Sequence, residues 1–333
     1  MTGREPSSDT TYGRRRESPG MQDTREQVLD ALAQEPVSGP DLADRLGVSR
    51  AAVWKHVEAL REAGFAVESD DAGYRLASVP EFGGPAVAYG LDAPFTVEYH
   101  DELPSTNARA RELAAEEASD VVVLADHQTG GRGRLDREWR SPAGGIYLSL
   151  VVRPEVPATH APAFTLAAAV ATTRAAREAG VDARIKWPND VVVVRDGREH
   201  KLAGVLTEME GEADRVSWVV VGVGVNANVD PEELPGEAAP TSIRAEAGDV
   251  DRRVFTQRLV EEFGALRHDL EGVVEAWREH ATTLGRRVRV DTPGGEVVGE
   301  AVDVRFPGTL VVDTDDGPVD VTAGDCEHLR PAE

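Results

Sequence analysis

The chain has 333 residues, with 60 Asp and Glu against 36 Lys and Arg, so its formal net charge is −24. This length predicts two or three domains, and a hydrophobic fraction of 41% excludes a wholly disordered chain. The one cysteine, Cys326, excludes an internal disulfide bond and a cysteine-based zinc site. No apolar run approaches the roughly 20 residues of a membrane span, and residues 1–20 lack the apolar stretch of a secretory signal. We therefore expect a soluble, cytoplasmic protein with no membrane partner.

Lysine is scarce among the basic residues. Lys55, Lys186 and Lys201 are lysines, and the other 33 of the 36 basic residues are arginines. A strongly acidic, lysine-poor surface suits a halophilic cytoplasm, because molar salt shortens the Debye length to about 3 Å and limits self-repulsion. An acidic protein without salt adaptation is the alternative. Since a compact ammonium differs from a planar guanidinium, the three lysines mark places where arginine would not substitute.

The N-terminal part predicts a disordered tail over residues 1–20 and a DNA-binding domain over residues 21–80. Thr24 is expected to cap a first helix, Gly47 to allow a tight turn, and Ser49 to cap a further helix that begins at Arg50. Two short strands around a glycine turn are expected next, within residues 66–76. Helix-turn-helix followed by such a wing is typical of winged-helix DNA-binding domains, and a helical interaction module is the alternative.

The helix after Ser49 supplies the candidate DNA contacts. Ser49, Arg50, Lys55 and His56 are expected to face phosphates and base edges. Residues 41–62, however, contain four basic and four acidic residues, so their net charge is zero. Sequence-independent attraction to DNA would then be weak, and binding would depend on base contacts, DNA shape and dimerisation.

The remaining chain predicts a linker over residues 81–94, a long α/β domain over 95–283 and a small domain over 284–333. Expected strands are 95–104, 121–128, 146–154, 184–194 with a break at Pro188, 201–210 and 216–225, and expected helices are 107–117, 161–180 and 251–282. The last residues alternate between apolar and polar, which predicts a small antiparallel barrel-like domain.

A Gly/Arg-rich loop, residues 130–139, follows the strand that ends at Gln128. Its glycines allow backbone N–H groups to approach an anion, and Arg132, Arg134 and Arg137 concentrate positive charge. The loop lacks the Gly-Lys-Ser/Thr of a P-loop, and no ribose-binding acid follows as in a dinucleotide fingerprint. The pattern indicates an anionic ligand such as a phosphate together with a carboxylate. Taken by itself, an ordinary surface loop explains it as well.

Two lysines stand near a break in the apolar strands. Pro188 removes a backbone donor, so the strand has to bulge or lie at a sheet edge, which would direct Lys186, Asn189 and Asp190 into one space. Lys201 follows in KLAG, where Gly204 permits close backbone approach. Surface lysines are the alternative for both positions. The run GVGVNAN, residues 222–228, is a further candidate site feature, and a tight turn that uses Asn and Gly is the alternative.

These motifs occur in the order found in one family. STN at 105–107, QTGGRGRLDREW at 128–139, KWPND, KLAGVLTE and GVGVN resemble the biotin protein ligases, over roughly residues 22–330. With its helix-turn-helix, the chain resembles the bifunctional type that also represses biotin synthesis genes. The resemblance implies an α+β fold class: an N-terminal winged helix-turn-helix, a central mixed α/β catalytic domain of the class II synthetase-like biotin/lipoate ligase type, and a C-terminal SH3-like β-barrel.

The resemblance also implies a reaction in two steps, with ATP, biotin and Mg²⁺ as the molecules bound. The biotin carboxylate attacks the α-phosphate of ATP and gives biotinyl-5′-AMP, and a lysine of a biotin carboxyl carrier domain then accepts the biotin. The implied partners are this carrier domain of a biotin-dependent carboxylase, operator DNA and a second copy of the chain in a homodimer.

The resemblance assigns roles to individual residues. The implied biotin-binding residues are Ser105, Thr106, Asn107, Gln128, Gly131, Arg132, Gly133, Arg134, Lys201 and Gly204. The implied ATP-binding residues are Arg134, Arg137, Lys186, Asn189, Asp190 and Asn226, of which Asp190 is also the metal ligand. Arg134, Lys186, Lys201 and Asp190 are the implied catalytic residues, and Trp139 and Tyr147 are expected to pack the pocket.

One residue departs from the family pattern. Asp136 stands where the family has glycine, so we expect either a stiffer loop or an Asp136 that turns outward to water. Two other functions stay open: a lipoate- or octanoyl-type acyl-adenylate ligase, and a biotin-sensing repressor without ligase activity.

Overall fold

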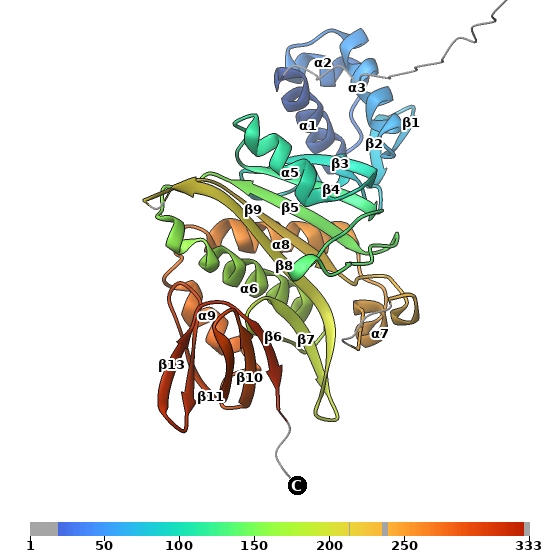
Figure 1. Cartoon of the computed structure of the whole chain (residues 1–333). Coiled ribbons are helices and arrows are strands. Elements are labelled where there is room, and N and C mark those ends of the chain that lie inside the picture. The colour runs from blue at the N-terminus through green and yellow to red at the C-terminus, as the bar shows by residue number, and fades with distance from the viewer. Residues whose placement is uncertain (1–18, 213, 235–238, 330–333) are drawn as a thin grey trace, which may run out of the picture. The chain divides into compact units, whose positions relative to one another are not determined.

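The computed structural model describes residues 19–212, 214–234 and 239–329 (Figure 1). The chain forms two compact units, one within residues 1–80 and one within residues 81–333. Most of the tail expected over residues 1–20 lies outside the described residues, and Pro19 begins the first helix. Among the described helices, none is both long enough and apolar enough to cross a membrane.

The first unit has the expected helix-turn-helix and β-hairpin. Its elements are α1 (Pro19–Gln34), α2 (Gly39–Leu46), α3 (Arg50–Glu62), β1 (Ala66–Asp70) and β2 (Gly73–Ser78). Ser49 caps α3 as expected, because its hydroxyl accepts a hydrogen bond from the Ala52 N–H, and Gly47 ends α2 with a φ of 65°. The expectation for Thr24 was wrong: α1 begins at Pro19, so Thr24 lies inside the helix and does not cap it.

The second unit begins with a helix where we expected a linker. Within residues 81–94, α4 (Gly84–Ala88) packs into the core, with Ala86 and Val87 fully buried. The side-chain amide of Gln257 donates hydrogen bonds to the carbonyl oxygens of Val87 and Tyr89. A short glycine- and proline-containing segment therefore becomes ordered, because it can bury apolar side chains against a helix distant in sequence.

A mixed sheet forms the centre of the second unit. Its seven strands within the described residues are β3 (Thr96–Leu103), β4 (Val121–Gln128), β5 (Ile146–Val152), β6 (Ala183–Lys186), β7 (Asp190–Arg195), β8 (Arg198–Glu212) and β9 (Arg215–Val225), in the order β3-β4-β5-β9-β8-β7-β6. β3 and β4 are parallel, and every other neighbouring pair is antiparallel. The expected strand over 184–194 is in fact two antiparallel strands, β6 and β7, joined by a turn in which the Trp187–Pro188 peptide is cis.

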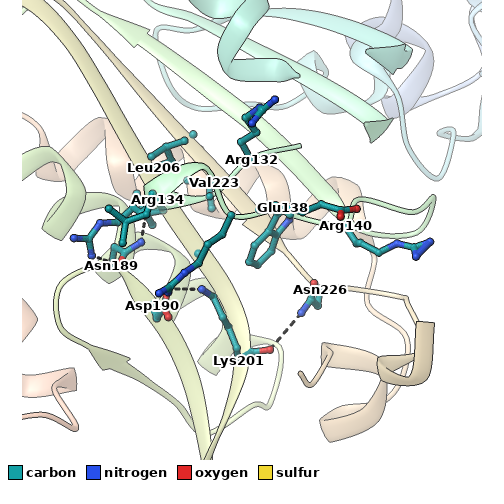
Figure 2. Close-up of a pocket in the computed structure, with 18 of the residues that line it drawn as sticks. Arg132, Arg134, Glu138, Arg140, Asn189, Asp190, Lys201, Leu206, Val223 and Asn226 are labelled. Atoms are coloured by element: carbon teal, nitrogen blue, oxygen red, sulfur yellow. Dashed lines mark hydrogen bonds and ion pairs between the residues drawn. The ribbon is translucent and has the colours of Figure 1, made fainter. Parts of the chain in front are cut away.

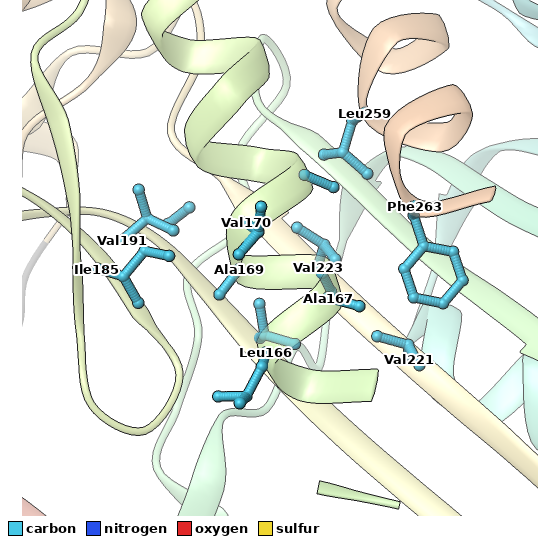
Figure 3. Packing of buried hydrophobic residues seen from close by; sticks show 14 of the residues in the cluster. Leu166, Ala167, Ala169, Val170, Ile185, Val191, Val221, Val223, Leu259 and Phe263 are labelled. Atoms are coloured by element: carbon cyan, nitrogen blue, oxygen red, sulfur yellow. The ribbon is translucent and has the colours of Figure 1, made fainter. Parts of the chain in front are cut away.

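Helices cover both faces of this sheet. α5 (Thr106–Ala115) packs with Val123 and Val220 on one face, and α6 (Pro162–Glu178) packs with Val221 and Val223 on the other. Figure 3 shows this second face, where α6 and α8 (Arg252–Leu266) meet side chains of β9. The expected helix over 251–282 is two helices, α8 and α9 (Val273–His280). The remaining helices are η1 (Arg134–Asp136), η2 (Ala158–His160), η3 (Pro231–Glu233) and α7 (Ile243–Ala247).

The C-terminal residues form the expected small antiparallel domain. Its strands are β10 (Arg287–Thr292), β11 (Gly295–Arg305), β12 (Thr309–Thr314), β13 (Gly317–Val321) and β14 (Asp325–His328), in the order β13-β12-β11-β10-β14. This order leaves the sheet open between the described strands β13 and β14, so the SH3-like arrangement is not a closed barrel. Val288, Val290 and Leu310 belong to the same buried cluster as the central domain, so the two parts of the unit share a core.

Candidate active site

A cavity of about 810 Å³ lies where the central sheet meets the C-terminal sheet. Figure 2 shows side chains converging on it from β7, β8 and β9 and from the Gly/Arg-rich loop of residues 130–139, called the arginine loop below. The residues predicted from the sequence that line it are Ser105, Thr106, Asn107, Gln128, Arg132, Gly133, Arg134, Arg137, Lys186, Asn189, Asp190, Lys201, Gly204 and Asn226. Gly131 is not among the lining residues. A Cβ there would lie 2.5 Å from the carbonyl oxygen of Trp139, so this glycine lets two parts of the loop approach.

One end of the cavity is a chain of neutral polar side chains at the start of α5. Ser105 caps α5 by accepting a hydrogen bond from the Ala108 N–H. The Thr106 N–H donates to Oε1 of Gln128 at 2.8 Å, and Nε2 of Gln128 donates to the Ser141 hydroxyl at 2.9 Å. This network fixes the amide of Gln128 in one orientation, because each of its two ends has a partner of the matching kind.

The side-chain amide of Asn107 is also fixed by a partner at each of its two ends. Its Nδ2 donates to Oε2 of Glu208 at 2.7 Å, and its Oδ1 accepts from the Ser149 hydroxyl at 2.6 Å. A Cβ at Gly222 would lie 2.0 Å from Oδ1 of Asn107, so glycine is required there by close packing. Gly222 and Gly224 lie inside β9, so the alternative of a tight glycine turn does not apply to these two glycines.

The arginine loop carries a residue in an unfavourable backbone conformation. Asp136 has a φ of 57°, a left-handed conformation that glycine adopts more easily. Its side chain is 87% exposed and pairs with Arg132 at 3.3 Å. Of the two arrangements expected for Asp136, the structure has the one in which the side chain turns outward to water.

Arg134 and Arg137 are anchored on the C-terminal sheet. Arg134 donates hydrogen bonds to Oδ1 of Asn189 at 3.1 Å and to the carbonyl oxygen of Gly324 at 2.8 Å. Arg137 donates to Oδ2 of Asp325 at 2.6 Å. Burial lowers the pKa of Arg134, and the nearby carboxylates of Asp325 and Asp190 oppose that effect. A guanidinium remains charged under these conditions, so the cavity holds a fixed positive group.

The two lysines reach the same cavity from β6 and β8, the strands on either side of β7, and each is paired with one carboxylate. Nζ of Lys201 lies 2.7 Å from Oδ1 of Asp190, and Nζ of Lys186 lies 3.3 Å from Oε2 of Glu199. Lys201 also lies 5.4 Å from the ring centroid of Trp139, a cation–π distance. Two of the three lysines of this chain therefore lie where an anionic ligand would need them.

Asn226 and the aromatic residues shape the cavity. The Asn226 amide donates to the carbonyl oxygens of Lys201 and Thr241, which fixes the backbone beside Lys201. A Cβ at Gly224 would lie 2.5 Å from Nε1 of Trp139, so β9 makes room for that ring. Tyr147 is fully buried and donates to the Pro142 carbonyl oxygen, so it packs beneath the site and does not line the cavity.

Two candidate residues were not assigned a role from the sequence. Glu199 holds Lys186 and stands among polar residues at the start of β8, and Glu208, the last residue of the KLAGVLTE motif, holds Asn107. Among the described residues, no group of three or more His, Cys, Asp or Glu side chains could hold a metal ion.

The first unit presents part of the predicted DNA surface. Arg50 and Lys55 are exposed on α3, and the Ser49 hydroxyl is engaged as the helix cap. His56 is 8% exposed and lies on the buried side of α3 with Val53 and Val57, so the expectation that it faces solvent was wrong. Trp54 was missed, although it is 56% exposed on the same helix.

Comparison with known proteins identifies three regions. Residues 99–226 match the biotin/lipoate A/B protein ligase family, residues 24–75 match a helix-turn-helix domain, and residues 283–329 match the biotin protein ligase C-terminal domain. The bifunctional ligase/repressor BirA of Bacillus subtilis is 36% identical, over 91% of this chain and 98% of that protein. The biotin–[acetyl-CoA-carboxylase] ligase of Mycobacterium tuberculosis is 36% identical over 68% of this chain and 86% of that protein. The structure of an Aquifex aeolicus biotin protein ligase in complex with biotin and ATP superposes with a TM-score of 0.59 and 25% identity, over 71% of this chain and 99% of that chain.

Proposed function

The chain belongs to the bifunctional ligase/repressor family of biotin protein ligases, and we propose that it joins biotin to ATP and then transfers it to a carrier lysine. In the first step, the biotin carboxylate attacks the α-phosphate, which forms biotinyl-5′-AMP and releases pyrophosphate. In the second step, the amine of a carrier lysine attacks the mixed anhydride, which forms an amide and releases AMP.

One observation carries this proposal: Arg134, Lys186 and Lys201 come from separate segments and line the same cavity. The first step brings a carboxylate against a polyphosphate, and two anions repel each other unless fixed cations hold them in line. We propose that Lys201 binds the biotin carboxylate and the developing acyl-phosphate oxygen. Lys186 and Arg137 would bind phosphate oxygens, and Arg134 would lie between the two ligands.

The neutral end of the cavity suits the ring of biotin. Asn107 and Gln128 have oriented amides, and Thr106 presents a hydroxyl, so this end offers both donors and acceptors to a cyclic urea. A lipoyl or octanoyl chain has no such polar ring, which favours biotin over those acids. We propose that Ser105, Thr106, Asn107 and Gln128 bind the polar ring end, and that Arg132 with the backbone of Gly131 and Gly133 closes over the carboxylate end.

Mg²⁺ fits this cavity as an ion that enters with the nucleotide. Mg²⁺ is usually held by one or two carboxylates together with substrate phosphates and waters, so a complete protein cage is not required. Asp190 lines the cavity and is the carboxylate we propose to hold it. When bound, the ion would neutralise negative charge on the phosphates. Asn189 and Asn226 would hold the adenylate, Asn189 through its bond to Arg134.

We propose that the helix-turn-helix unit binds operator DNA as part of a homodimer. Arg50 and Lys55 are exposed on α3, while the balanced charge of residues 41–62 gives a single unit little phosphate attraction. Two linked copies on a symmetric site would double the number of base contacts.

The decisive experiment is ATP-dependent transfer of labelled biotin to a purified biotin carboxyl carrier domain. We expect a stable amide on the carrier lysine and release of AMP. Transfer of lipoate or octanoate in place of biotin would contradict the substrate, and binding of biotin without transfer would leave only a sensing role.

A further inference from the structure

A partly buried group of ionisable side chains connects the C-terminal domain with Lys186. Oε2 of Glu199 lies 3.3 Å from Nζ of Lys186, and Oε1 of the same carboxylate is in ion-pair contact with Nδ1 of His328. Arg286 lies 3.6 Å from that second oxygen. The His328 side chain is 5% exposed, so this contact is shielded from solvent. Glu199 itself does not line the cavity, and it touches the site through Lys186.

The protons of this group can be placed by chemistry. An ionised carboxylate only accepts, so Nδ1 of His328 has to carry a proton toward Glu199. Nε2 of His328 lies 3.1 Å from the Thr283 hydroxyl, whose oxygen also accepts a hydrogen bond from the Trp187 N–H at 2.9 Å. Burial raises the pKa of Glu199, but His328 and Lys186 outweigh that and hold it below its usual range, so the carboxylate is ionised at neutral pH.

The C-terminal domain also contacts the turn that follows Lys186. The indole N–H of Trp187 donates to the carbonyl oxygen of Gly308 at 2.9 Å, and Trp187 is almost completely buried. The backbone next to Lys186 and the ammonium at the end of its side chain are therefore both tied to residues more than 90 positions further along the chain.

We propose that Glu199 is a positioning residue, held from behind by His328, that fixes the ammonium of Lys186 for nucleotide phosphates, so that the C-terminal domain sets the geometry of nucleotide binding. This inference rests on the proposed function, in which Lys186 binds phosphate oxygens. Lys201 has its own carboxylate partner, Asp190, so the biotin end of the site is expected to be independent of Glu199.

The nucleotide affinity of Glu199→Gln distinguishes a positioning role of Glu199 from an effect of its negative charge alone, because the two roles predict changes in opposite directions. Removal of one negative charge near the phosphates would strengthen nucleotide binding if Glu199 acted only through its charge. If Glu199 positions Lys186, the variant binds a non-hydrolysable ATP analogue about tenfold more weakly. This is the loss expected when the Lys186 ammonium no longer makes one hydrogen bond to a phosphate oxygen. Calorimetry of the full chain measures this, and the exposed carboxylate variant Glu296→Gln on β11 is the matched control.

A double-mutant cycle separates positioning from a general structural role. In a Lys186→Ala background, Glu199→Gln should change nucleotide affinity less than about twofold, because the group it acts through is gone. The affinity of Glu199→Gln for biotin alone, measured by calorimetry, should equal that of the wild-type protein. A loss of affinity that is equally large with and without Lys186, or a tighter complex in Glu199→Gln, would overturn the proposal.

A pair of His328 variants tests the role of the C-terminal domain. The amide nitrogen of asparagine can take the place of Nδ1, so His328→Asn should keep near wild-type nucleotide affinity. His328→Phe keeps a buried ring without a donor and should weaken nucleotide binding as Glu199→Gln does. Equal affinity in the two variants would overturn the role of His328. A wild-type protein that binds the nucleotide analogue but makes no biotinyl-AMP would contradict the proposed function alone, since the coupling is measured by binding.

Discussion

The ammonium nitrogen of Lys201 on β8 lies 2.7 Å from Oδ1 of Asp190 on the neighbouring strand β7, inside the cavity. The ion pair holds the lysine in place before any ligand arrives. An incoming carboxylate can then bind the remaining N–H donors of the ammonium, because a lysine has three of them. The cation is therefore preorganised for a carboxylate ligand.

We expect Lys201→Ala to lower the rate of biotinyl-AMP formation by about 10²–10³-fold, the usual loss when one group that stabilises a developing negative charge is removed. Pyrophosphate release with biotin and ATP measures it. Lys201→Arg should not restore the rate, because a planar guanidinium differs in shape from the ammonium that fits beside Trp139. Arg198→Ala, an exposed basic residue on the same strand, is the control. A wild-type rate in Lys201→Ala would remove this residue from the mechanism.

The arginine loop should become looser in Asp136→Gly. Glycine relieves the left-handed conformation at φ 57° but widens the range of loop conformers, and the ion pair with Arg132 is lost. We expect biotinyl-AMP to be released faster in the absence of the carrier. A filter-binding assay measures this release rate. Asp136→Asn removes the charge while still tolerating a positive φ, so it separates the two causes. Unchanged release in both variants would exclude Asp136 from control of the loop.

Gly224→Ala should displace Trp139. The new Cβ would lie 2.5 Å from Nε1 of that ring, and such overpacking costs about 1–3 kcal/mol. We expect a lower free energy of unfolding and weaker binding of biotin, measured by denaturant titration and calorimetry. Gly264→Ala in α8 is the control, because its nearest neighbours are at 3.6 Å and alanine favours a helix. If biotin affinity is unchanged, Trp139 has no part in the biotin site.

In the helix-turn-helix unit, exposed and buried candidates for DNA contact should respond differently to substitution. Arg50→Ala and Lys55→Ala should weaken operator binding and reduce the slope of log affinity against log salt by about 0.9 for each phosphate contact removed. His56→Ala should instead destabilise the unit, because His56 packs on the buried side of α3. Electrophoretic mobility shift at several salt concentrations and thermal unfolding measure the two effects. An unchanged salt slope would mean that neither basic residue contacts a phosphate.

Acid should destabilise the second unit partly through Glu98. Burial raises the pKa of Glu98, but its bonds to Arg109 at 2.7 Å and His100 at 2.8 Å outweigh this and hold the pKa below its usual range. A carboxyl whose pKa is lower in the folded state stabilises the fold above its unfolded pKa, and that contribution is lost as the pH falls through the folded value. The free energy of unfolding should therefore fall as the pH drops below the usual pKa of a glutamate carboxyl. Glu98→Gln should be less stable at neutral pH and show a shallower acid slope, and an identical slope would contradict this.

Local patterns were sufficient for part of this structure. Ser49 caps the start of α3 and Gly47 ends α2, because a cap and a left-handed turn each need only a few neighbouring atoms. His56 could also have been placed from the sequence, since Val53, His56, Val57 and Leu60 follow the spacing of one helical face. The helical spacing therefore predicts a buried His56, whereas the side-chain chemistry of histidine taken alone suggests a DNA contact.

The helix-turn-helix, most strands and the motifs that mark a biotin protein ligase are predictable without coordinates, because propensity, capping and motif order are properties of neighbouring residues. Long-range packing determined that the segment with Ala86 and Val87 joins the core, that KWPND forms the connection between two strands, and that Gly222 and Gly224 make room for Asn107 and Trp139. It also decided that Glu199 meets both Lys186 and His328. Such contacts join residues far apart in the chain, and their energy depends on burial and distance, which exist only once the chain has folded.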